Sequence, residues 1–282
     1  LAYQADRSPE QRTAPLRTYL VVDRRIVVDD AFRRALKIQE RLIDALSNNS
    51  HEVLTKAARR LVAIAGDATA PIVAYQLRGG IYRDMSWARS SNQPLLVTST
   101  VDQVGSRLLF RGYGVSDSSR PIHAALVACD SLILLDEAHC SKAFAQTLRA
   151  VRSYQAKPWL QHPLGTPSIS VEMTATPSEQ VAEEHRFELS REERSDQESL
   201  LGKRLRTPKP TELRIASKAK GKSATKVFAA ELATAASGLV SDNRKAIAVV
   251  VNRVETAKEI YRHLRTEFPD ASSVELMIGR MR

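Results

Sequence analysis

Short apolar runs alternate along this chain with longer segments in which apolar residues recur at helical spacing. The runs that predict strands are residues 18–22, 71–75, 94–98, 132–135, 168–173, 246–251 and 273–278. The other segments predict helices at residues 52–65, 102–110, 121–129, 142–151, 227–240 and 254–268, and one that begins at a cap formed by Asp29 or Asp30. Strands that alternate with helices usually pair in parallel, so the pattern predicts an α/β fold with a parallel sheet and flanking helices.

A change in composition divides the chain. Residues 183–226 are rich in Arg, Lys, Glu, Ser and Pro and carry few apolar positions, which is typical of a charged linker or insertion. We therefore expect a near-complete first domain at residues 1–182 and the beginning of a second domain at residues 227–282.

Composition also limits the class of protein. An apolar content of 43% in 282 residues is enough for a real core, and no apolar run is long enough to span a membrane. Cys129 and Cys140 are the only cysteines, and we expect two buried thiols in a cytoplasmic protein in preference to a disulfide or a zinc site. The formal net charge of +10 favours a polyanionic partner through release of its counterions.

Two adjacent carboxylates, Asp136 and Glu137, follow the predicted strand at residues 132–135. In an ATPase, an Asp at a strand end holds Mg²⁺, usually through water, and the metal bridges the β- and γ-phosphates. The next carboxylate can orient or deprotonate the attacking water. The plainer alternative is a strand that simply enters a polar loop, with His139 as an ordinary hydrogen-bonded loop residue.

Two hydroxyl residues, Thr174 and Thr176, follow the next predicted strand and precede Pro177. Short hydroxyl side chains at a strand end can hydrogen-bond a neighbouring His or carboxylate. We therefore expect this loop to lie against residues 136–139. The alternative is a strand end punctuated by proline.

Polar residues follow three further strands at their expected carboxyl ends, where parallel sheets bind ligands. Glycine lets a backbone approach a phosphate closely, and a helix N-terminus offers donors to phosphate oxygens. The candidate nucleic-acid contacts are Arg24, Arg25, Arg78, Gly79, Thr100 and Gln103. Each has a plainer reading as a solvated charge or an ordinary helix cap.

The Asp-Glu-Ala-His sequence at residues 136–139 resembles the DEAH motif of superfamily 2 helicases, and residues 171–177 resemble their motif III. Residues 19–25, and especially residues 102–112 followed by the DEAH sequence, are similar to one family. That family is the CRISPR-associated helicase-nuclease of type I systems, in its type I-U (I-G) branch. The resemblance covers residues 18–282.

The resemblance implies a RecA-like fold and ATP-driven 3′-to-5′ movement on single-stranded DNA in prokaryotic antiviral defence. ATP and Mg²⁺ would be the cofactors, and a Cascade-type CRISPR effector complex would recruit the protein. Asp136 would hold Mg²⁺ and Glu137 would activate water. His139, Thr174 and Thr176 would couple hydrolysis to DNA movement.

A helicase of this class also needs a phosphate loop, Gly-x-x-x-x-Gly-Lys-Ser/Thr, upstream of Asp136, and the sequence contains none there. Gly221, Lys222 and Ser223 imitate its end, but Ala216 stands where its first glycine should be. Motifs V and VI, with their arginine finger, and a nuclease His-Asp pair do not appear either. We therefore expect a fragment that does not turn over ATP by itself.

Two alternatives stay open. One is a different superfamily 2 translocase or an RNA helicase, because the choice of DNA rests on the resemblance. The other is a non-catalytic nucleic-acid-binding module that keeps the RecA-like shell.

Overall fold

The structure is a computed structural model that describes residues 1–49, 51–66, 70–80, 85–155, 168–176, 182–216, 219–240, 246–270 and 273–278. The chain divides into two compact units, Leu1–Phe187 and Glu188–Arg282. Among the described residues, no helix has both the length and the apolar character needed to cross a membrane.

The first unit is built on a five-stranded sheet in which every neighbouring pair is parallel. Its strands are β1 (Arg17–Val22), β2 (Val73–Leu77), β3 (Leu95–Thr100), β4 (Ser131–Leu135) and β5 (Ile169–Glu172). The strand order is β2-β3-β1-β4-β5, so β1 lies at the centre and pairs with both β3 and β4. The predicted α/β class with a parallel sheet is confirmed, and the architecture is consistent with a RecA-like fold.

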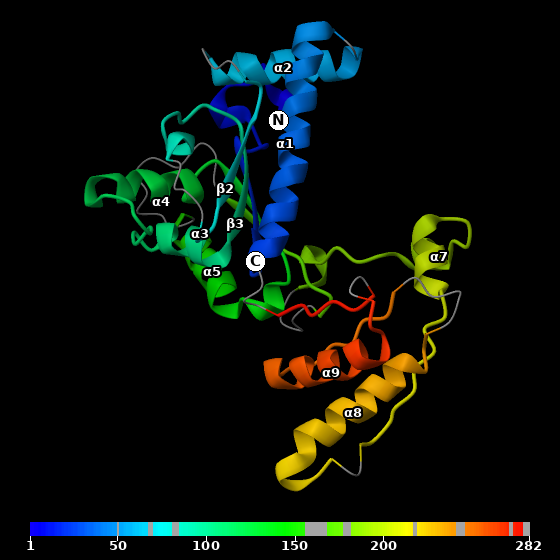
Figure 1. Cartoon of the computed structure of the whole chain (residues 1–282). Coiled ribbons are helices and arrows are strands. Elements are labelled where there is room, and N and C mark those ends of the chain that lie inside the picture. The colour runs from blue at the N-terminus through cyan, green and yellow to red at the C-terminus, as the bar shows by residue number, and fades with distance from the viewer. Residues whose placement is uncertain are drawn as a thin grey trace. The chain divides into compact units, whose positions relative to one another are not determined.

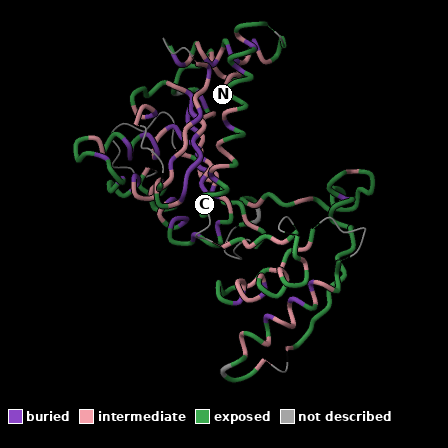
Figure 2. Tube along the Cα trace, viewed as in Figure 1, coloured by how far each residue is buried: buried purple, intermediate pink, exposed green. Residues whose placement is uncertain are grey.

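Helices flank this sheet (Figure 1). They are α1 (Arg25–Asn48), α2 (Glu52–Ala65), α3 (Val101–Leu108), α4 (Arg120–Ala128) and α5 (Lys142–Gln155). Alternate strand residues, such as Tyr19, Val21, Val97, Ile133 and Leu135, form one buried cluster with apolar residues of α3, α4 and α5. Figure 2 shows that burial in this unit is concentrated along the strands. This period of two is what a strand with one tightly packed face requires.

Helix α1 begins earlier than predicted. Its first residue is Arg25 and its N-cap is Arg24, so the predicted cap at Asp29 or Asp30 is wrong. Asp29 instead accepts hydrogen bonds from Gln76 and Arg78 at 2.5 Å each. Asp30 forms ion pairs with Arg33 and Arg34. The predicted end of α2 is confirmed, because Gly66 follows its last residue with φ at +72°.

Both cysteines are free thiols. Cys129 is half-buried and Cys140 is exposed, so the expectation that both are buried is wrong. Cys140 is exposed because it ends the short 3₁₀ helix η5 (Ala138–Cys140) in the loop after β4.

In the described part of the second unit, the regular elements are helices. Its helices are α6 (Arg191–Ser195), α7 (Leu200–Arg206), α8 (Ala224–Ser237) and α9 (Val254–Glu267). The two short helices lie inside residues 183–226, where a linker was predicted. A capping box between Ser190 and Glu193 begins α6, which explains why a highly charged segment forms a helical turn.

Residues 246–251 do not form the predicted buried strand: they make no strand pairing within the described part of the chain. Val249 and Val251 pack against Ala229, Ala233 and Ile260 of α8 and α9, whereas Val250 is 90% exposed. The segment is therefore extended with one face on the helix pair. Residues 273–278 likewise belong to no strand among the residues described, so the predicted strand there is also wrong.

Candidate functional site

The carboxyl ends of all five strands meet at one edge of the sheet, because all five run in parallel. Every candidate site residue from the sequence lies at or just after one of these ends, except Gln103, which lies in the first turn of α3. The edge therefore gathers residues that are far apart in the sequence.

The loop after β4 is held in place by its own backbone. The Asp136 amide donates to the Val21 carbonyl at 2.9 Å, which continues the alignment with β1. Asp136 Oδ1 accepts the Glu137 amide at 3.1 Å, and Glu137 has φ at +49°. A left-handed conformation is uncommon for a residue other than glycine, and such strain concentrates at functional sites.

The loop after β5 lies against this loop, as the sequence predicted. The Met173 amide donates to the Leu135 carbonyl at 2.8 Å, and the Ala138 amide donates to the Met173 carbonyl at 3.1 Å. His139 Nδ1 then lies 3.0 Å from Thr174 Oγ1 and 3.3 Å from Glu137 Oε2. The histidine thus contacts both the hydroxyl loop and the second carboxylate.

Thr176 contacts Thr174. Its backbone amide donates to Thr174 Oγ1 at 3.1 Å, so it orients the hydroxyl that faces His139. Pro177, the last residue of the predicted motif, lies outside the described residues.

Two arginines converge on the glycine pair after β2. A Cβ atom added to Gly79 would lie 3.2 Å from Arg25 Nη2. At Gly80, where φ is +83°, an added Cβ would lie 3.7 Å from Arg25 Nη1 and 3.9 Å from Arg78 Nη1. The carboxylate of Asp29 forms an ion pair with Arg78, one of the two guanidinium groups. The arrangement suits an anion that approaches the glycine backbone.

Three other candidates are not part of this convergence. Arg24 is an exposed N-cap residue of α1 without a side-chain capping bond. Thr100 is buried at the end of β3. Gln103 accepts a hydrogen bond from the buried Arg107 at 2.8 Å through its side chain, so it holds an internal cation.

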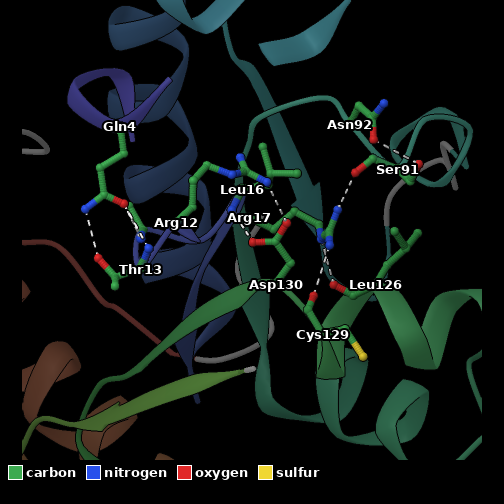
Figure 3. Close-up of polar contacts among 11 residues, drawn as sticks. Gln4, Arg12, Thr13, Leu16, Arg17, Ser91, Asn92, Leu126, Cys129 and Asp130 are labelled. Carbon is green, nitrogen blue, oxygen red and sulfur yellow. Dashed lines mark hydrogen bonds and ion pairs between the residues drawn. The ribbon is translucent and has the colours of Figure 1, made fainter. Parts of the chain in front are cut away.

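A polar cluster that was not predicted from the sequence lies at the opposite, amino edge of the sheet (Figure 3). The buried Arg17 guanidinium donates to the carbonyls of Ser91, Leu126 and Cys129 at 2.7–3.0 Å. Asp130, with φ at +50°, accepts the Leu16 amide at 2.9 Å. These contacts hold the beginnings of β1 and β4 together. A charged residue that opens a strand was the signal available in the sequence.

The donor set at the carboxyl edge fits Mg²⁺ together with a phosphorylated ligand. Within the described part of the chain, no three His, Cys, Asp or Glu side chains are grouped to hold a metal ion. Mg²⁺ is usually bound by one or two carboxylates, with phosphates and water as the remaining ligands. Asp136 and Glu137 supply such carboxylates.

A cavity of about 530 Å³ lies elsewhere in the first unit, at the turn between α1 and α2. Its lining includes Asn49, Lys56, Arg59 and Arg60 and none of the candidate site residues.

Comparisons of the chain with protein-family models, with curated proteins and with solved structures found no match.

Proposed function

We propose that this chain belongs to an ATP-dependent motor that moves along nucleic acid. The observation that carries the proposal is the contact between His139 and Thr174 at 3.0 Å. It joins the strand end that bears Asp136 and Glu137 to the neighbouring strand end, in the order that the DEAH and motif III sequences require.

In this proposal the two carboxylates divide the chemistry of hydrolysis. Asp136 would hold Mg²⁺, and Glu137 would orient the attacking water and accept its proton. Bound Mg²⁺-ATP supplies the phosphoanhydride bond whose cleavage drives movement. His139 lies 3.3 Å from Glu137 and 3.0 Å from Thr174, so it can transmit a change at the carboxylate to the neighbouring loop.

The nucleic-acid side is proposed to lie at Gly79 and Gly80, where Arg25 and Arg78 converge. Contacts of this kind bind phosphates without reading bases, which suits a protein that moves along a strand. The net charge of +10 supports a polyanionic ligand.

The finer assignment rests on the family resemblance. It specifies 3′-to-5′ movement on single-stranded DNA, recruitment by a Cascade-type complex and a place in the prokaryotic cytoplasm. The support for it is the Asp-Glu-Ala-His motif together with residues 102–112.

Glu137→Gln in the native gene product tests the proposal. The variant should keep ATP binding and lose DNA-stimulated ATP hydrolysis, because an amide cannot accept the proton of water. Glu40→Gln makes the same chemical change on the exposed surface of α1 and should leave hydrolysis unchanged. Equal turnover by the Glu137→Gln variant and the unmodified protein would refute the role assigned to Glu137.

A non-catalytic nucleic-acid-binding module is the second candidate. It is favoured by one observation, namely that no Gly-x-x-x-x-Gly-Lys-Ser/Thr sequence occurs in residues 1–282. DNA binding by the native gene product without any ATP hydrolysis would select this candidate.

A further inference from the structure

Residues 109–115, which follow α3, present an aromatic and basic surface. Leu109 is 59% exposed, Phe110 is 56% exposed and Tyr113 is 53% exposed. Arg111 lies between the two aromatic residues and is also exposed. Residues 109, 110, 111 and 113 are called the α3 platform below.

Phe110 follows the C-cap of α3, at a position where glycine is the usual residue. The Phe110 amide donates to the Arg107 carbonyl at 3.0 Å, and the Arg111 amide donates to the Ser106 carbonyl at 2.7 Å. These two bonds form a Schellman motif, whose C′ residue must be left-handed. Phe110 occupies that position with φ at +56°. A bulky residue in this conformation is strained, and strain of this kind is concentrated at functional sites.

Tyr113 lies in a hydrogen-bonded turn that follows. The Val115 amide donates to the Gly112 carbonyl at 3.2 Å, and Gly114 has φ at +70°, as the third position of a type II turn requires. Gly112 is packed tightly, because an added Cβ would lie 2.9 Å from Val115 Cγ2. The turn therefore holds Tyr113 outward with little freedom.

Neither ring makes a ring–ring or cation–π contact with a described residue. Among the described residues, the one ring–ring contact is between Trp87 and His123, and the one cation–π contact is Arg107 over Trp87. Phe110 and Tyr113 therefore stack neither on each other nor on a guanidinium group of the described chain. Arg111 forms no ion pair with any described residue, whereas the nearby Arg120 is paired with Asp117 at 2.8 Å.

We propose that the α3 platform stacks unpaired bases of single-stranded nucleic acid, with Arg111 on an adjacent phosphate. The proposal rests on the proposed function for its ligand class. Aromatic side chains with an interleaved cation are the usual means of holding single strands, since every base has a face on which to stack. The net charge of +10 makes the chain complementary to such a polyanion. Helix α3 also begins directly after β3, and its eight residues span about 12 Å. One strand can therefore reach both the platform and the carboxyl edge.

The test compares two fluorescent ligands of equal charge: an oligothymidine of about 15 nucleotides and an abasic strand of the same length. The double variant Phe110→Gly/Tyr113→Ala should bind the oligothymidine at least roughly 30-fold more weakly, because each of the two lost stacking contacts weakens binding roughly 5-fold or more. Its affinity for the abasic strand should not change. Tyr3→Ala removes an aromatic ring that is 82% exposed elsewhere in the first unit and should affect neither ligand.

Phe110→Gly alone separates binding from folding. Glycine suits the left-handed C′ position, so this variant should unfold at the same or a higher temperature while it binds the oligothymidine more weakly. A lower unfolding temperature with unchanged affinity would mean that Phe110 is a packing residue and would overturn the proposal.

Other outcomes also overturn it. One is equal affinity of the unmodified chain for the two ligands. Another is a sedimentation coefficient that is lower for the double variant than for the unmodified chain. That result would make the α3 platform a contact between copies of the chain. Arg25→Ala/Arg78→Ala reports on the proposed function separately, because loss of phosphate contacts weakens both ligands equally. If that variant binds both ligands normally while the platform variant loses the oligothymidine, the phosphate site fails and the platform stands.

Discussion

His139 Nδ1 lies 3.0 Å from Thr174 Oγ1, so a side-chain contact joins the loops that follow two adjacent parallel strands. Thr174→Val removes the hydroxyl and keeps the shape of the side chain. In the native gene product we expect DNA-stimulated ATP hydrolysis to fall about fivefold, the equivalent of about 1 kcal/mol for one hydrogen bond. DNA affinity should stay the same.

The matched control for this contact is Thr147→Val, because the Thr147 hydroxyl donates along α5, to the Ala143 carbonyl at 3.0 Å. Steady-state hydrolysis with and without single-stranded DNA measures both variants. Equal effects of the two substitutions would show that the contact with His139 has no special role.

Arg25→Ala/Arg78→Ala removes two cations from the glycine pair after β2. We expect weaker binding of single-stranded DNA and a salt dependence whose logarithmic slope is smaller by about 1.4, since each phosphate contact contributes about 0.7. Fluorescence anisotropy across a salt series measures this slope. Arg33→Ala/Arg34→Ala is the control, because both residues are exposed on α1 and paired with Asp30. The same slope in both double variants would exclude the glycine pair as a phosphate site.

Residues 1–282 alone should not hydrolyse ATP, with or without DNA, because their sequence offers no phosphate loop. A phosphate-release assay on the purified chain checks this. Turnover that DNA stimulates and Glu137→Gln abolishes would contradict the expectation.

Arg17→Met should lower the free energy of unfolding by about 2–4 kcal/mol, because it leaves the carbonyls of Ser91, Leu126 and Cys129 without their donor. Urea denaturation measures the loss. Arg33→Met changes an exposed arginine on α1 and should cost less than about 0.5 kcal/mol. A similar small loss at Arg17 would mean that water replaces the guanidinium.

Stability should fall in mildly acidic solution because of His123. This residue is buried against Trp87 with ring centroids 4.9 Å apart. Burial, and secondly the charge of Arg107, lowers the pKa of His123 below the ordinary value of 6.5. The unfolded chain therefore binds a proton that the folded chain excludes, and stability present above pH 6.5 is lost as the pH falls toward the lowered pKa.

His123→Phe keeps an aromatic ring against Trp87 and removes the titrating group. Urea denaturation of both proteins at about pH 7.5 and about pH 5.5 isolates the effect, since 6.5 is the ordinary pKa of His. We expect a smaller loss of stability in the variant. An equal loss would assign the pH dependence to other groups.

The five strands of the first unit could be predicted from the sequence, and so could the contact between residues 136–139 and residues 174–176. Both follow from local pattern, because apolar runs define strands and parallel strands end at one edge. The start of α1 could not be predicted, since Asp29 is engaged by Gln76 and Arg78, which lie far along the chain.

Long-range pairing also explains the other differences. Residues 246–251 have the composition of a strand, yet a strand needs a hydrogen-bonded neighbour, and none is present among the described residues. Gln103 resembles a surface contact in the sequence, but it binds the buried Arg107. The amino-edge contacts of Arg17 reach carbonyls on two separate segments, at Ser91 and at the C-terminal end of α4, which no local pattern reveals.

The strand order β2-β3-β1-β4 separates the Gly79–Gly80 pair, after β2, from Asp136, after β4. With about 4.8 Å between neighbouring strands, three strand spacings place these two strand ends about 14 Å apart. That separation is set by backbone hydrogen bonds of the sheet and not by the loops themselves. Substitutions in either loop can therefore change its chemistry while the distance between the two strand ends stays constant.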